Sequence, residues 1–189
     1  MKRVIIVVTH LGSNSASLCH MLDKSKKIQW AQTGIVYDHP TTTKEITSIE
    51  HKFNNFVGLY VNEVFYNYQI CHKGIYQSCE FIYLVREPKC LGILIDKDNA
   101  SYIVDYYVFR LRRIYEMIKC MRSGTFLTWQ DLASQKGVRI LEDKLGISEK
   151  LIFKEMPYSK KPLNFPNNLL KKAERAYELC LYRINSLGL

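Results

Sequence analysis

The sequence predicts one three-layer α/β domain with a mainly parallel sheet of four or five strands flanked by helices. Apolar segments at residues 4–8, 58–64 and 81–85 lack the alternation typical of a half-exposed sheet, and segments with helical spacing separate them. A chain of 189 residues with 47% hydrophobic content can bury one sizeable core. We therefore expect residues 1–189 to form a single domain.

The clearest pattern in the sequence is a strand, a loop and a helix near the N-terminus, which together predict an anion-binding site. Residues 4–8 are β-branched and apolar, residues 9–15 are polar, and apolar residues resume at helical spacing from Ala16. The first N–H groups of such a helix point into the loop and favour an anion, and Ser13 and Ser15 add hydroxyl donors. A strict Walker motif is absent, so an ordinary strand-to-helix turn with a serine cap remains the alternative.

The middle of the chain continues the alternation of strands and helices. We expect a short strand at 28–31, a loop over 32–45 that leads into a helix, a strand at 58–64 and a helix at 66–76. The strand at 81–85 ends in Arg86, where ligands of open α/β sheets bind, and a guanidinium there suits a phosphate. Pairing with Glu87 or solvent is the alternative for Arg86.

The last third of the chain predicts three helices and one strand. An amphipathic helix lies within 99–121 and is closed by Gly124, with Phe109 on its apolar side and Arg110, Arg112 and Arg113 on its basic side. A strand is expected at 125–129, then a helix that Asp131 caps and that reaches Gly146. A terminal helix begins at Asn167 or Asn168 and runs through Leu187.

Composition limits the class of ligand and the compartment. The formal net charge of +9 suits an anionic ligand, but the basic residues form no long block, so we do not expect nucleic acid as a partner. The six cysteines lack a CxxC pair, which predicts neither a disulfide framework nor a metal site. No apolar run is long enough for a signal peptide or membrane span, so we expect a soluble cytoplasmic protein.

Three stretches, in order, resemble the P-loop sulfotransferase family, which uses 3′-phosphoadenosine 5′-phosphosulfate as donor. THLGSNSA at 9–16 lies where the family has its 5′-phosphosulfate loop, a pattern such as TYPKSGTT. FIYLVREP at 81–88 is similar to the strand and RxP turn of the 3′-phosphate site, and LTWQDL with LEDKLGI resembles the YEDL and FLG segments. The resemblance covers about residues 3–147, leaves 148–189 as a loop and a C-terminal helix, and implies a divergent member with a P-loop-like fold.

The resemblance also implies a site and a reaction. The 5′-phosphosulfate of an anionic nucleotide would be wrapped by five residues, and its 3′-phosphate would bind Arg86. Those five are Gly12, Ser13, Asn14, Ser15 and Ala16. The implied function is transfer of a sulfuryl group from the donor, without a metal, to a hydroxyl or amine of a carbohydrate, phenol or peptide.

Three positions depart from the family pattern. The basic residue of the family loop falls on Gly12, and that cation normally stabilises charge that develops during transfer. The serine eight residues after the RxP arginine falls on Leu94. The catalytic glutamate of some members falls near Gln32, which cannot act as a general base at neutral pH.

Four residues are candidates to replace the missing catalytic groups: His10, Asp38, His39 and Glu63. His10 is fixed in the loop by the motif; when neutral it could accept a proton, and when protonated it could stand in for the lost cation. A surface or capping role is the alternative for each of the four.

Other functions compete with transfer. A catalytically inactive nucleotide-binding or phosphate-binding protein of the same fold is favoured by the missing cation. A small P-loop kinase lacks support because the phosphate-binding lysine is absent. A nucleic-acid-binding module rests on charge alone.

Overall fold

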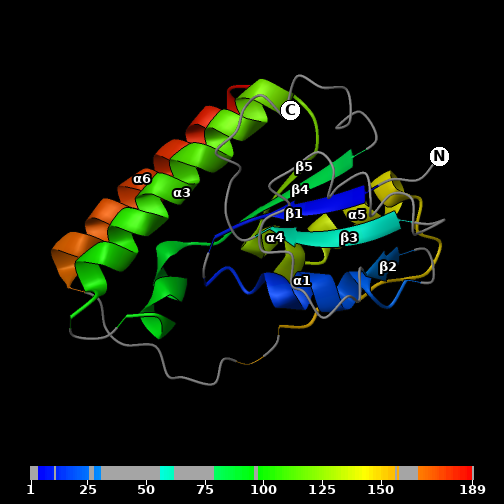
Figure 1. Cartoon of the computed structure of the whole chain (residues 1–189), viewed down its shortest axis with the longest axis horizontal. Coiled ribbons are helices and arrows are strands. Elements are labelled where there is room, and N and C mark those ends of the chain that lie inside the picture. The colour runs from blue at the N-terminus through cyan, green and yellow to red at the C-terminus, as the bar shows by residue number, and fades with distance from the viewer. Residues whose placement is uncertain are drawn as a thin grey trace.

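The computed structural model describes residues 4–10, 12–25, 28–30, 56–61, 79–95, 98–155, 157 and 166–188. Five parallel strands form one sheet in the order β2-β3-β1-β4-β5. They are β1 (Val4–Val8), β2 (Ile28–Trp30), β3 (Phe56–Val61), β4 (Cys79–Val85) and β5 (Thr125–Thr128). The predicted fold class is therefore confirmed, with helices on both sides of the sheet (Figure 1).

Alternate residues of the central strands point to opposite faces of the sheet and pack in two separate hydrophobic cores. Val8, Tyr83 and Val85 pack in one cluster with α3 (Ala100–Met121), α6 (Asn167–Asn185) and the 3-10 helix η3 (Pro88–Ile93). Val7 and Leu84 pack on the other face with α1 (Ser15–Leu22), α4 (Trp129–Ala133) and α5 (Lys136–Leu145). Because both faces are covered, β1 and residues 81–85 of β4 are apolar throughout, as is typical of the buried strands of a parallel sheet.

The strand order creates a topological switch point beside β1. From β1 the chain passes to β2 and β3 on one side, and it then crosses to β4 and β5 on the other side. In such sheets ligands bind in the crevice at the carboxyl ends of the strands around the switch point. The β1–α1 loop and Arg86 both lie at this edge of the sheet.

The strand bounds differ from the predicted ones by a few residues at their ends. The third strand begins at Phe56 and reaches Val61, where the sequence predicted 58–64. The predicted loop at 32–45 and helix at 66–76 lie outside the described residues.

The long helix α3 corrects the prediction of which residues face the core. Phe109, predicted on the apolar side, is 45% exposed, whereas Arg110, predicted on the basic side, is 2% exposed. Residue type suggested the wrong side because Arg110 lies one helical turn after buried Tyr107, on the packed face. Its Nη2 donates to the backbone carbonyl of Thr9, which allows a charged side chain to occupy that face.

Two predicted helix ends are also corrected. Arg122, rather than Gly124, caps α3, with a φ of 45° and its N–H donating to the Ile118 carbonyl at 2.8 Å. A Cβ on Gly124 would lie 2.7 Å from the ring of Tyr83, so glycine is needed there for close packing. Thr128 caps α4, and Asp131 is its capping-box partner rather than the cap.

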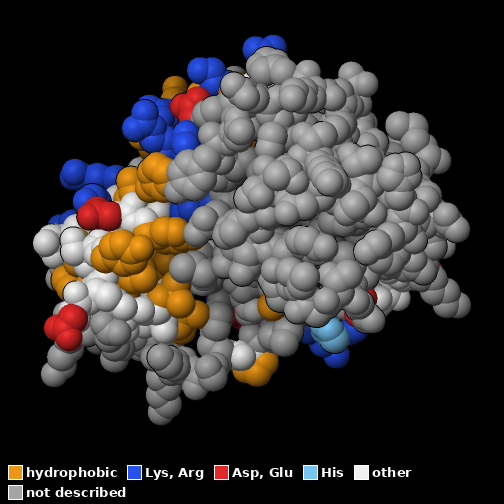
Figure 2. All heavy atoms as spheres, in the orientation of Figure 1, with side chains coloured by type: hydrophobic (Ala, Val, Ile, Leu, Met, Phe, Trp, Pro, Cys, Tyr) orange, Lys and Arg blue, Asp and Glu red, His pale blue; other side chains and the backbone are white. Residues whose placement is uncertain are grey.

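The helices α3 and α6 lie side by side and run parallel (Figure 1). Asp105 of α3 pairs with Lys172 of α6. Six residues farther along α3 and eight farther along α6, Cys180 Sγ lies 3.6 Å from the Leu111 carbonyl. Lys and Arg side chains gather over this helix pair in the face of the molecule that Figure 2 shows. Of the helices in the described part of the chain, none combines the length and apolar character needed to cross a bilayer.

Candidate functional site

The β1–α1 loop is held by the hydroxyl groups at its two ends. The Thr9 hydroxyl donates to the Leu84 carbonyl of β4 at 2.9 Å and lies 2.6 Å from the Ser13 hydroxyl. The Ser13 N–H donates to the His10 carbonyl at 3.2 Å, which closes a tight turn. Thr9 and Ser13 are both buried, so the loop is fixed to the ends of two adjacent strands.

The backbone of the loop uses left-handed conformations at two positions. Gly12 has a φ of 79°, and Asn14, the residue before α1, has a φ of 58°. Asparagine is one of the few residues besides glycine that tolerate this region. The Asn14 carbonyl accepts from the Ser17 N–H at 2.9 Å, and its Oδ1 accepts from the Ser17 hydroxyl at 2.9 Å. These contacts direct the chain into α1, whose first residue, Ser15, is buried.

Gly12, which aligns with the basic residue of the sulfotransferase loops that this stretch resembles, occupies a confined position. A Cβ at Gly12 would meet the Cys90 carbonyl oxygen at 3.3 Å and Leu94 Cδ1 at 3.4 Å. Leu94, at the position of the missing serine, thus packs against the loop from the end of η3. A side chain at position 12 would need both backbone strain and movement of these neighbours.

His10 joins the ends of β1 and β4. Its Nε2 accepts a hydrogen bond from the Arg86 backbone N–H at 3.0 Å, and its ring meets the Tyr107 ring edge-on at 4.8 Å between centroids. The side chain is 0% exposed. Because Nε2 already accepts the hydrogen bond from the Arg86 N–H, this nitrogen has a structural role in the conformation described.

Arg86 lies at the carboxyl end of β4, beside the loop. Its guanidinium carbon is 4.1 Å from the centroid of the Trp129 ring, and its Nη1 is 3.0 Å from Glu155 Oε1. The Arg86 side chain is 12% exposed and that of Glu155 is 43% exposed. The predicted alternative partner, Glu87, instead accepts a hydrogen bond from Gln130 at 2.7 Å.

Tyr107, which lies against His10, also holds the backbone of Arg86. Its hydroxyl donates to the Arg86 carbonyl at 2.6 Å. Burial raises the pKa of the Tyr107 phenol above its ordinary range, so the hydroxyl keeps its proton and remains a donor at any physiological pH. The Arg86 guanidinium, held by Trp129 and Glu155, thus extends from a backbone that His10 and Tyr107 both bind.

The predicted site residues fall into two groups. The structure brings together the loop residues Gly12 to Ala16, His10 and Arg86 at neighbouring strand ends. The catalytic candidates Asp38, His39 and Glu63, and also Gln32, lie outside the described residues. Sequence reasoning missed Arg110, Tyr107 and Glu155 as parts of this region, because their partners are many residues away in the chain.

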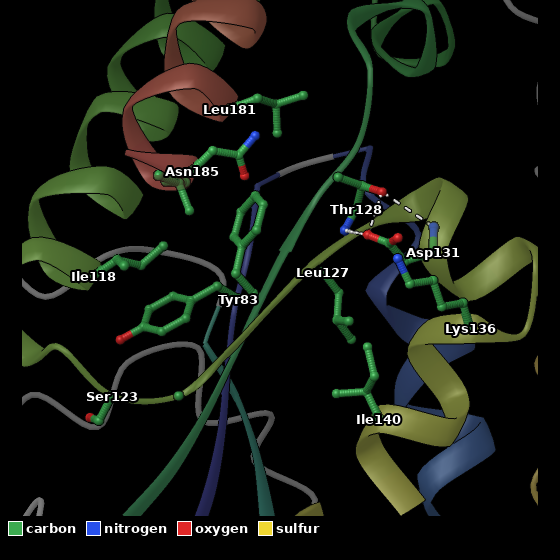
Figure 3. Close-up of a pocket in the computed structure, with 13 residues that line it drawn as sticks. Tyr83, Ile118, Ser123, Leu127, Thr128, Asp131, Lys136, Ile140, Leu181 and Asn185 are labelled. Atoms are coloured by element: carbon green, nitrogen blue, oxygen red, sulfur yellow. Dashed lines mark hydrogen bonds between the residues drawn. The ribbon is translucent and has the colours of Figure 1, made fainter. Parts of the chain in front are cut away.

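A separate cavity of about 290 Å³ lies along β5, away from the loop. Figure 3 shows Leu181 and Asn185 of α6 on one side of it and Ile140 and Lys136 of α5 on the other. Its floor is β5, and the Thr128–Asp131 capping box forms one end. None of the described residues of the β1–α1 loop lines this cavity, so it is distinct from the region around that loop and Arg86.

Comparison with known proteins finds likeness in structure rather than in sequence. No family model matches the chain, and no curated protein matches it. A sulfotransferase from Alicyclobacillus acidocaldarius matches with a TM-score of 0.59 at 10% identity, over 97% of this chain and 94% of that protein. Mouse sulfotransferase SULT7A1 in complex with PAP matches with a TM-score of 0.53 at 14% identity, over 78% of this chain.

The match with the mouse protein covers only 60% of that protein's length, so the mouse protein is considerably longer than this chain. At sequence identities this low, the structural match establishes a shared architecture and leaves the reaction open. The chain therefore has the fold of the sulfotransferases, with its β1–α1 loop and Arg86 at adjacent strand ends.

Proposed function

We propose that the chain binds 3′-phosphoadenosine 5′-phosphosulfate and transfers its sulfuryl group to a hydroxyl or amine. The bond between the sulfur and the 5′-phosphate oxygen breaks, a bond from the sulfur to the acceptor forms, and 3′-phosphoadenosine 5′-phosphate and the acceptor's proton leave. One observation carries this proposal: the β1–α1 loop and Arg86 follow strands that pair directly with each other. Neighbouring strands lie about 5 Å apart, so the two anion-binding elements are within the length of one nucleotide. The His10 to Arg86 hydrogen bond keeps them together.

The residues present fit the two charged ends of such a donor. In any helix the first N–H groups lack carbonyl partners within the helix, and at α1 they face the loop. Ser13 and Ser15 add hydroxyl groups there, and Arg86 offers a planar guanidinium suited to the 3′-phosphate. When bound, the donor supplies the activated sulfuryl group. We propose His10 as a positioning residue and leave Asp38, His39 and Glu63 as candidate proton acceptors.

A catalytically inactive nucleotide-binding protein is the second candidate. Gly12 favours it, because no cation extends from the loop at the position where the family has one. Restoring the cation with Gly12→Lys would be a poor test, since the φ of 79° and the contact with Cys90 would strain the variant. A test must therefore separate binding from transfer in the natural sequence.

Isothermal titration separates the classes of ligand. Purified protein is titrated with 3′-phosphoadenosine 5′-phosphate, ATP and a DNA duplex at about 0.15 M salt, where screening weakens nonspecific contacts. Selective binding of the 3′-phosphorylated nucleotide supports the proposal. Preference for ATP would favour a kinase, and preference for the duplex would favour a nucleic-acid-binding module.

A transfer assay then decides between enzyme and binding protein. Labelled sulfate on the donor is offered with a pool of carbohydrate, phenolic and peptide acceptors. Transfer that Arg86→Ala reduces supports the enzyme, and we expect that variant to lose about 1.5 to 3 kcal/mol of nucleotide binding. Donor binding without transfer to any acceptor would favour the binding protein.

A further inference from the structure

The helix α3 contacts both halves of the nucleotide region from two successive turns. Tyr107 donates to the carbonyl of Arg86, at the end of β4. Arg110, three residues later and so on the same helix face, donates from Nη2 to the carbonyl of Thr9, at the end of β1. One helix therefore sets the position of the predicted 3′-phosphate residue and of the residue that opens the loop.

Arg110 differs from the arginines that follow it in the same helix. It is 2% exposed, whereas Arg112 is exposed and Arg113 is half-buried. A guanidinium keeps its proton in proteins, so Arg110 places a permanent positive charge inside the molecule next to the loop. Burying a charge is costly, and an anion bound in the loop would offset part of that cost.

We propose that Arg110 supplies the 5′ end of the nucleotide site with the positive charge that Gly12 does not provide. This inference rests on the proposed function, because it assigns Arg110 to the 5′-phosphate or phosphosulfate of the same ligand. The sequence places no Lys or Arg in the loop itself, and the structure brings an Arg to the loop's first carbonyl from a helix about 100 residues away. The missing loop cation is thus replaced from another element.

The charge acts across Thr9. The Arg110 guanidinium contacts the Thr9 carbonyl, and the Thr9 hydroxyl lies 2.6 Å from the Ser13 hydroxyl, within the loop that would bind the anion. One residue therefore links the guanidinium to the loop, and two residue lengths of extended chain, roughly 7 Å, serve as the assumed separation between the charge and a bound anion. At an effective dielectric constant of about 20, such a pair of unit charges changes a dissociation constant about fiftyfold, and less where water screens it. Arg110 is accordingly a positioning residue, not a catalytic one.

The test compares ligands that differ in one phosphate. Dissociation constants are measured by isothermal titration for 3′-phosphoadenosine 5′-phosphate, adenosine 3′-monophosphate and adenosine 5′-monophosphate. The variants are Arg110→Gln, which removes the charge, Arg110→Lys, which keeps it, and Arg112→Gln as the matched control. Arg112 lies on the same helix and is exposed. Arg112→Gln removes one positive charge, as Arg110→Gln does, so the two variants have the same net charge.

We expect Arg110→Gln to weaken both ligands that carry a 5′-phosphate about tenfold to fiftyfold and to leave adenosine 3′-monophosphate within about twofold. Arg110→Lys should recover most of the difference, and Arg112→Gln should match the wild type. A residue needed only for folding would weaken all three ligands together. If Arg110→Gln does not fold, Arg110→Met fills the same space without a polar group and takes its place.

Two results would overturn the inference. Equal loss for all three ligands, or no loss for the 5′-phosphorylated ones, would show that Arg110 only holds the Thr9 carbonyl. Wild-type protein that binds none of the three nucleotides would instead reject the proposed function, and this inference with it. The wild-type titration and the variant ratios thus report the two failures separately.

Discussion

If Arg86 binds the 3′-phosphate as proposed, replacing Glu155 should strengthen nucleotide binding, because the Glu155 carboxylate pairs with the same guanidinium. Arg86 Nη1 is 3.0 Å from Glu155 Oε1. In Glu155→Gln the charge pair is lost while a side chain of the same shape remains. The Glu155 side chain is 43% exposed, so the pair is worth only about 0.5 to 1 kcal/mol. Releasing it should tighten binding of 3′-phosphoadenosine 5′-phosphate about twofold to fivefold.

The control is a nucleotide that lacks the contested group. Adenosine 5′-monophosphate has no 3′-phosphate, so its dissociation constant should be the same in wild type and in Glu155→Gln. The gain should also disappear in an Arg86→Ala background, as a double-mutant cycle would reveal. Equal tightening of both nucleotides, or an unchanged constant for the 3′-phosphorylated one, would refute competition between Glu155 and the ligand.

Three further predictions concern stability and reactivity. Thr128→Ala should lower the free energy of unfolding by about 0.5 to 2 kcal/mol in urea titrations, because it breaks the capping box with Asp131, whereas Thr128→Ser should retain stability. Gly12→Ala should cost about 1 to 3 kcal/mol in the same assay, because its φ is 79° and Cys90 adjoins it; an unchanged midpoint would contradict this strain. Burial raises the pKa of Cys90 to about 12, so at pH 8 peptide mapping should find exposed Cys120 alkylated long before Cys90. Equal labelling rates for Cys90 and Cys120 would contradict the burial of the Cys90 thiol. Because the raised pKa favours the protonated Cys90 thiol, the contribution of this group to the free energy of unfolding is complete below about pH 9 and is lost as the pH rises towards 12.

The sheet was predictable because its strands are short, apolar and separated by helical patterns. The predicted segments at 4–8, 81–85 and 125–129 match β1, β4 and β5 to within two residues at each end. A strand buried on both faces leaves a continuous apolar run, which local sequence shows directly. The loop after β1 could be placed for the same reason, because it interrupts such a run.

The partners of the site residues could not be predicted, since they depend on distant packing. Glu155, which pairs with Arg86, follows it by 69 positions, and nothing local marks it. The sequence prediction puts Arg110 on the solvent side of its helix because arginine is usually exposed, whereas its position in the helix puts it on the buried side. Its location one turn after Tyr107 was a usable signal, since that spacing continues the apolar stripe.

The parallel pairing of α3 and α6 has a consequence for how the chain folds. Their contacts join residues 67 to 69 positions apart, as between Asp105 and Lys172, so closing this loop costs about 4 kcal/mol of chain entropy. During synthesis α3 is complete long before Cys180 and Ile184 exist to cover its apolar side. We therefore expect α6 to dock after the folding transition state, so that truncating Ile184 to Ala speeds unfolding and leaves the refolding rate nearly unchanged.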